Sequence, residues 1–163
     1  MKCRFICFAV LYFALSFQQA SAFVGPATFA VVGVRGTDSL ALRDKPSLTG
    51  RILTRIPFNT ITLRNLGTRS NGWCYVQYAK IKGFAACKYL GESSGTRFYS
   101  SHGYTGKLPF YQKASKNSPI AGYLPPYETG IEGLGACSTT WCPINQQGKK
   151  GWVARKYLAS WQF

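Results

Sequence analysis

The sequence has few acidic residues and a single histidine. Its 163 residues include 20 Lys and Arg, 5 Asp and Glu, and 1 His. Acid–base and metal-dependent catalysis need several carboxylates or imidazoles to converge on one site. We therefore expect a protein with no catalytic residues, no metal site and no cofactor. Its formal charge of +15 predicts a cationic surface.

The chain also lacks any long low-complexity or acidic run, and its composition excludes intrinsic disorder. Hydrophobic residues make up 46% of the sequence and aromatic residues 15%. That is too apolar for a disordered chain. The length leaves room for one ordinary domain or two small ones.

The first 22 residues have the pattern of a secretory signal peptide. Lys2 and Arg4 form a basic start, residues 5–17 are almost unbroken in their apolar character, and Ala20–Ala22 supplies small residues for cleavage. The apolar run is shorter than the roughly 20 residues that span a membrane. We expect cleavage before Phe23, a mature charge of about +13 and a periplasmic or secreted protein.

An internal repeat organises the remaining chain. A shift of 68 residues aligns residues 37–90 with 105–158 without a gap and gives 17 identities in 54 positions. Chance would give about four. The predicted organisation is a flank at 23–36, repeat 1 at 37–90, a Gly/Ser-rich exposed linker at 91–104, repeat 2 at 105–158 and a tail at 159–163. The alternative for the linker is that Phe98, Tyr99 and Tyr104 pack onto a neighbouring repeat.

Each repeat predicts short strands and no helix. Leu40 and Leu42 alternate with smaller or polar residues, and a second alternation surrounds Leu63. The segments 73–78 and 83–87 follow, with turn residues between them. Five short strands in about 55 residues predict an all-β fold of two tandem small β-barrels.

Four cysteines follow the signal peptide, and an even number in an exported chain favours disulfides. A four-residue hairpin loop at 79–82 would place Cys74 opposite Cys87, close enough for a bond. Cys137 and Cys142 flank the segment 138–141 one hairpin earlier. The alternative is a Cys74–Cys142 bond between repeats. A zinc site is disfavoured because paired C-x-x-C spacing is missing.

The motifs of both repeats resemble those of the bacterial SH3 (SH3b) family. Repeat 1 has ALRDKPS at 41–47, NGWCYV at 71–76 and GFAACKYL at 83–90, similar to the N-V-R-x-x-P-S, G-W-x-x-V and G-W-V-x-x-x-Y-L patterns. Repeat 2 matches best at its end, GWVARKYL at 151–158. Its cysteine pair is similar to one in alphaproteobacterial periplasmic members. The resemblance implies two SH3-like barrels in an exported bacterial binding protein, since several members attach enzymes to cell-wall peptidoglycan.

Strand parity predicts one outward aromatic and basic surface on each repeat. In repeat 1 the residues are Trp73, Tyr75 and Phe84, bordered by Arg69, Lys80 and Lys82. In repeat 2 they are Trp141 and Trp152, bordered by Lys149, Lys150 and Arg155. Such surfaces stack on sugar rings or peptide groups and pair with carboxylates or phosphates. The alternative is burial of these aromatics against the neighbouring repeat or the linker.

These features predict a non-catalytic, monomeric binding module. His102 falls in the expected linker, and disulfide-bonded cysteines provide no Cys–His nucleophile. The favoured ligand is peptidoglycan, through its glycan or its stem peptide. One alternative is an envelope or host protein. The other is a polyanion such as lipopolysaccharide, anionic lipid or nucleic acid, for which the charge alone is the argument.

Overall fold

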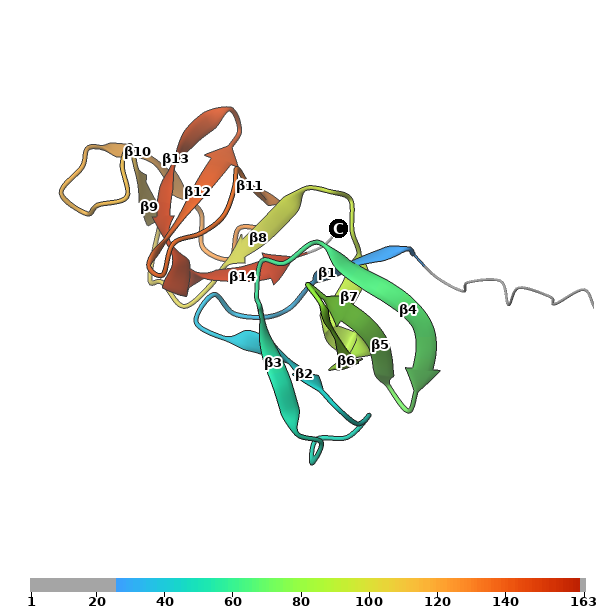
Figure 1. The fold of residues 1–163 in the computed structure, drawn as a ribbon. Helices are drawn as coiled ribbons and strands as arrows, with labels where there is room; N and C mark the ends of the chain where they lie inside the picture. The colour runs from blue at the N-terminus through green and yellow to red at the C-terminus, as the bar shows by residue number, and fades with distance from the viewer. Residues whose placement is uncertain (1–25, 162–163) are drawn as a thin grey trace, which may run out of the picture.

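The structure is a computed structural model that describes residues 26–161, so the expected signal peptide lies outside the described residues. It contains two antiparallel seven-stranded sheets, one for each repeat (Figure 1). The strand orders are β3-β2-β6-β5-β4-β1-β7 and β10-β9-β13-β12-β11-β8-β14, which is the same topology twice. The predicted all-β fold of two tandem units is confirmed.

The strands are short and a single 3-10 turn precedes the last strand of each sheet. Repeat 1 consists of β1 (Thr28–Val31), β2 (Ser39–Arg43), β3 (Ile52–Pro57), β4 (Leu63–Ser70), β5 (Trp73–Tyr78), β6 (Ile81–Ala86), η1 (Cys87–Tyr89) and β7 (Leu90–Glu92). Repeat 2 consists of β8 (Arg97–Ser101), β9 (Leu108–Tyr111), β10 (Ile120–Leu124), β11 (Ile131–Gly133), β12 (Trp141–Gln146), β13 (Lys149–Ala154), η2 (Arg155–Tyr157) and β14 (Leu158–Trp161). None of the elements described within residues 26–161 is a helix with the length and apolar character of a membrane span.

Each sheet begins one strand earlier than the sequence repeat. The expected flank contains β1, which pairs with β4 and β7, and the expected linker contains β8, which pairs with β11 and β14. Residues 97–101 are therefore a strand and not an exposed linker, and the alternative that Tyr99 packs onto a neighbour is confirmed, since Tyr99 is buried against Phe58. Without β8, one edge of β11 would lack its hydrogen-bonding partner. The structural repeat therefore begins before the sequence similarity does.

Both predicted disulfides are present, Cys74–Cys87 and Cys137–Cys142. The hairpin next to the first bond is tighter than expected, because Tyr78 pairs with Ile81 and leaves a two-residue loop at 79–80. Cys74 consequently faces Ala85, and Cys87 follows just after β6. The register differs from the prediction by two residues, which preserves the side of the sheet each side chain faces. Disulfides persist in oxidising compartments, which agrees with an exported protein.

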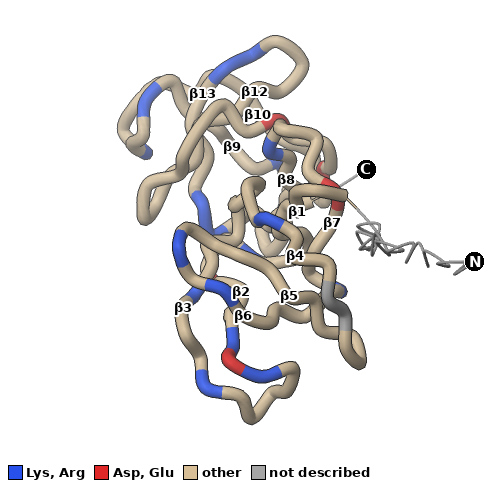
Figure 2. Tube along the Cα trace, turned by 45° about the vertical axis from the view of Figure 1, so that its right-hand side comes forward, with Lys and Arg blue, Asp and Glu red and all other residues tan. Residues whose placement is uncertain are grey.

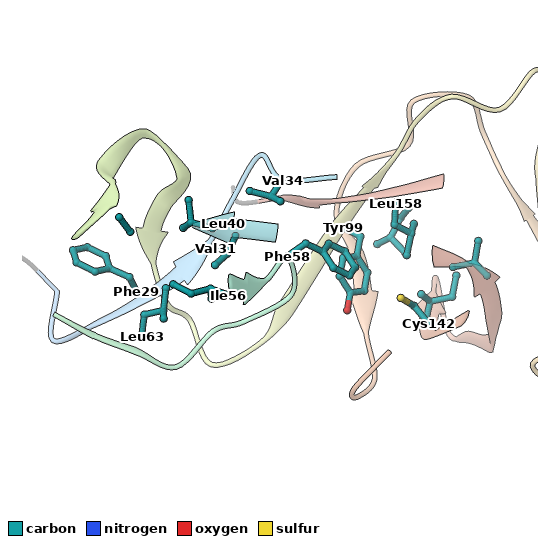
Figure 3. Packing of buried hydrophobic residues seen from close by; sticks show 14 of the residues in the cluster. Phe29, Val31, Val34, Leu40, Ile56, Phe58, Leu63, Tyr99, Cys142 and Leu158 are labelled. Atoms are coloured by element: carbon teal, nitrogen blue, oxygen red, sulfur yellow. The ribbon is translucent and has the colours of Figure 1, made fainter. Parts of the chain in front are cut away.

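The alternating residues face one continuous apolar core. Leu40, Leu42, Val76 and Ala85 are buried in repeat 1, and Val153 is buried in repeat 2, as strand parity predicts. Phe58 and Tyr99 connect the two halves. Their rings stack with centroids 5.6 Å apart, between the apolar residues of the two sheets (Figure 3). The two cores therefore meet through a pair of aromatic rings.

The backbone also joins the repeats. The segment between β1 and β2 runs along β14, where Gly33 N–H donates to Ser160 O at 2.8 Å and Ser160 N–H donates to Val34 O at 2.8 Å. Further along, Gly36 N–H donates to Leu158 O at 2.6 Å. A Cβ atom at Gly36 would collide with the Arg155 carbonyl, so only glycine fits this close approach. The junction is a packed and hydrogen-bonded interface.

Candidate binding site

Three predicted aromatic residues lie on one outward strip of repeat 1. Tyr75 on β5 is directly opposite Phe84 on β6, with ring centroids 4.8 Å apart. Trp73 is two residues earlier on β5 and so lies on the same side of the sheet. All three are half-buried, whereas Cys74 and Val76, which face the opposite side of β5, are buried. The predicted strip exists, as a patch in which two of the rings pack on each other.

The corresponding strip of repeat 2 contains both predicted tryptophans. Trp141 on β12 and Trp152 on β13 are half-buried, and Trp152 is opposite Pro143. Tyr111 of β9 pairs with Trp152 and makes an edge contact with Trp141, with centroids 5.6 Å apart. In repeat 1 this position is Arg43, whose Nη1 donates to Gly50 O at 2.7 Å and so holds the following loop. The two strips therefore differ in chemistry despite their common register.

The predicted cations are not all beside these aromatic rings. Lys80 and Lys82 are exposed at the tip of the β5–β6 hairpin, and Lys149 and Lys150 are exposed at the tip of the β12–β13 hairpin. The backbone of Arg69 lies in β4, and its side chain is outside the described part of the structure. Figure 2 shows Lys and Arg spread over both repeats with few Asp and Glu. The basic surface is therefore broad, and charge alone does not identify a site.

A groove beside Trp141 brings one predicted aromatic residue and one predicted cation together. This junction groove has a volume of about 420 Å³. Its lining residues are Gly36, Thr37, Lys116, Thr139, Thr140, Trp141, Ala154, Arg155 and Lys156. No acidic residue is among them. An indole, three cations and three threonine hydroxyls therefore face one hollow of ligand size.

The junction groove depends on residues that repeat 1 lacks at the equivalent positions. The 68-residue shift places Leu48 at the position of Lys116 and Cys87 at that of Arg155. Trp73 is the equivalent of Trp141. Repeat 1 thus keeps the tryptophan without two of the three cations. The wall formed by residues 36–37 comes from repeat 1 itself, so the groove is built jointly by both repeats.

Arg155 is held rigidly at the centre of the junction. Its Nε donates to Gly36 O at 2.7 Å, and its Nη1 donates to Ser138 O at 3.2 Å. Its guanidinium carbon is 5.0 Å from the centroid of the Phe58 ring, a cation–π contact between the repeats. Arg155 was predicted as a binding residue, and the structure gives it a second task in connecting the repeats.

Sequence reasoning missed the other cations and the hydroxyl groups of the groove. Lys116 comes from the loop between β9 and β10, Thr139 and Thr140 precede β12, and Lys156 belongs to η2. None of them is on the strand faces used for the prediction. The only sequence signal was the change from Leu48 to Lys116 between the repeats, and its meaning depends on how the repeats dock.

The remaining chemically reactive side chains have structural contacts. His102 Nε2 lies 3.0 Å from Leu158 O, beside the last strand. Each cysteine within 26–161 belongs to a disulfide. In that same range, no group of three or more His, Cys, Asp or Glu side chains is placed to hold a metal ion.

Comparison with solved structures gives distant matches. No protein-family model and no curated protein matches the chain. Among solved structures, NlpC2 from Trichomonas vaginalis is 16% identical over 83% of this chain and 48% of that chain, with a TM-score of 0.34. NlpC1 from the same organism is 18% identical over 80% of this chain and 45% of that chain, with a TM-score of 0.33. This chain spans less than half the length of either protein.

Proposed function

We propose that the chain is a non-catalytic, exported binding protein that recognises cell-wall peptidoglycan in the junction groove. The observation that carries this proposal is the position of Trp141 in a groove with Lys116, Arg155 and Lys156 and without carboxylates. Peptidoglycan offers the matching groups, since it has sugar rings and also the carboxylates of its stem peptides.

Each class of lining residue has a task in this proposal. The indole of Trp141 presents an apolar face to a sugar ring, and its edge contact with Tyr111 fixes its orientation. Threonine hydroxyls hydrogen-bond sugar hydroxyl or amide groups. The three cations pair with a carboxylate, and such charge-assisted bonds are stronger than neutral ones. Arg155 is pre-positioned by its bonds to Gly36 and Ser138, which lowers the entropy lost on binding.

Retention on purified peptidoglycan sacculi across a salt series tests the proposal. At 1 M salt the Debye length falls to about 3 Å, which removes long-range charge attraction. The wild-type protein is expected to remain bound, and Trp141→Ala to lose most of its retention because the stacking surface is gone. Trp73→Ala is the matched control, because it removes the same residue from the equivalent position of repeat 1. Thermal unfolding of each variant verifies that it is folded.

Two outcomes would contradict the proposal. Retention that disappears at moderate salt, equally in all three proteins, would indicate a polyanion ligand bound by net charge. Absence of retention at every salt concentration would direct the search to an envelope or host protein. The non-catalytic part has its own test: mass spectrometry of the unreduced protein after alkylation should find no free thiol in the mature chain.

A further inference from the structure

A second hollow at the junction contains three arginines from both repeats. This arginine cleft has a volume of about 480 Å³. Arg55 comes from β3 of repeat 1, while Arg97 and Arg155 come from β8 and η2 of repeat 2. Polar side chains lie among them, Asn59, Thr62 and Tyr78 included. No carboxylate is among the described residues that line the cleft.

Two of the three guanidinium groups are held in place from across the junction. Arg97 Nε donates to Asn59 O of repeat 1 at 3.1 Å. Arg155 Nε donates to Gly36 O of the same repeat. The bond made by Arg97 uses Nε alone, which leaves both of its Nη groups for a ligand. Guanidinium groups fixed in this way match the two oxygens of a carboxylate or phosphate.

The fold itself does not require these arginines, as the other repeat shows. The 68-residue shift places Tyr123 at the position of Arg55 and Cys87 at that of Arg155. The residue equivalent to Arg97 is Ala27, as the strand register shows. Arg97 pairs with Gly133, and Ala27 O accepts a hydrogen bond from the N–H of Asn65, which lies 68 residues before Gly133. Each position holds an uncharged residue in the other repeat. The cluster is therefore specific to the junction.

Three like charges that share a small space repel one another, and a bound anion would relieve that repulsion. Two of these arginines also act on a buried tyrosine beside the cleft. The charges of Arg97 and Arg155 favour the ionised form of the buried Tyr99 phenol, although burial is the larger effect and raises its pKa overall.

We infer that the arginine cleft is an oxyanion-binding site, which takes the carboxylate or phosphate group of a polar ligand. The site is formed only when the two repeats are docked, because each supplies part of it. The cleft and the junction groove can be tested separately. Arg55 and Arg97 line the cleft but not the groove, and Arg155 is the one residue that lines both. Loss of peptidoglycan binding would therefore leave this inference standing.

Calorimetric titration of the mature protein tests the inference. Sodium phosphate and sodium citrate are titrated separately, both at constant ionic strength. We expect saturable binding of at least one anion, and the one that binds distinguishes a phosphate from a carboxylate ligand. Arg55→Gln and Arg97→Gln should each weaken binding about tenfold or more, because each removes a charged donor. Arg55 is exposed and has no hydrogen bond to the junction to lose, so its variant should keep the fold.

Arg64→Gln is the matched control, since Arg64 is an exposed strand arginine of repeat 1 outside the cleft. Its affinity should equal that of the wild type. Equal weakening in Arg64→Gln and Arg55→Gln would overturn the inference, because it would show attraction by net charge. The inference would also be overturned if neither anion saturated the wild-type protein at concentrations that fill a site with a Kd of about 1 mM.

Discussion

The two repeats share one strand order but place different residues at corresponding positions around their junction. Phe58 in repeat 1 has no exposed surface, whereas Pro126, 68 residues later, is exposed. Phe58 is covered because it reaches repeat 2 and stacks on Tyr99, while the same corner of repeat 2 has no third repeat to meet. Contact with the neighbour, and not the strand topology, accounts for this difference.

The disulfides show a second difference. The Cys74–Cys87 bond connects β5 to the residue after β6, with a sequence separation of 13. In repeat 2 the bond moves to the segment before β12, with a separation of 5, and Arg155 occupies the position of Cys87. The moved bond keeps repeat 2 cross-linked while it releases a position for a guanidinium group. Both the junction groove and the arginine cleft use that group.

The largest expected effect concerns the aromatic stack. Phe58→Ala should lower the free energy of unfolding by about 3–5 kcal/mol, because it leaves a cavity between Tyr99 and the core of repeat 1. Pro126→Ala at the equivalent position should change it by no more than about 0.5 kcal/mol. Urea unfolding of both variants measures the difference. Similar losses at the two positions would mean that the junction is not the source of the asymmetry.

The disulfides should differ in strength according to their loop lengths. Replacement of Cys74 and Cys87 by alanine should cost about 3 kcal/mol, and replacement of Cys137 and Cys142 about 2 kcal/mol, since the longer loop restricts the unfolded chain more. Thermal and urea unfolding of the two double variants, each with its other bond intact, give the comparison. A larger loss from the shorter loop would show that local packing, rather than loop closure, dominates.

A smaller effect is expected from Tyr99→Phe, which gives repeat 2 the residue that repeat 1 has at the equivalent strand position, Phe29. The variant loses the hydrogen bond that the Tyr99 hydroxyl donates to Cys137 Sγ at 3.5 Å, at a cost of about 1 kcal/mol at pH 7.

The pH dependence of the same variant provides its control. Burial raises the pKa of Tyr99 above its ordinary value of 10.0, so the folded protein retains this proton more strongly than the unfolded chain does. The stability from this group is present in full below pH 10.0 and is lost as the pH rises through the raised pKa. The difference between wild type and variant should therefore shrink above pH 10.0. A constant difference would contradict burial of the phenol.

Much of the fold could be predicted from the sequence because the information is local. Alternation of apolar residues predicts that Val76 and Val153 face the core, and the cysteine spacings predict both disulfides. The first strand of each repeat could not be predicted, because β1 and β8 are too short for periodicity and are identified only by their pairing partners. Hairpin registers were off by two residues because the residues at 79–82 do not specify the loop length.

The candidate site was less predictable than the fold. Strand parity found Trp141, and the end of the repeat drew attention to Arg155. Lys116, Arg55 and Arg97 were missed because their proximity depends on how two folded repeats dock, and docking leaves no periodic signal in the sequence. The Phe58–Tyr99 contact could not be predicted for the same reason, because it too forms only when the repeats dock.

Binding in the junction groove is tested most directly by finding which tryptophan a soluble peptidoglycan fragment contacts. Fluorine NMR of protein labelled with 5-fluorotryptophan gives separate resonances for its 4 tryptophans. During titration with disaccharide-peptide fragments, we expect a saturable shift of the Trp141 resonance and no shift of the Trp73 resonance. A shift of Trp73 with Trp141 unchanged, or no shift of any resonance, would contradict the assignment of the junction groove as the binding site.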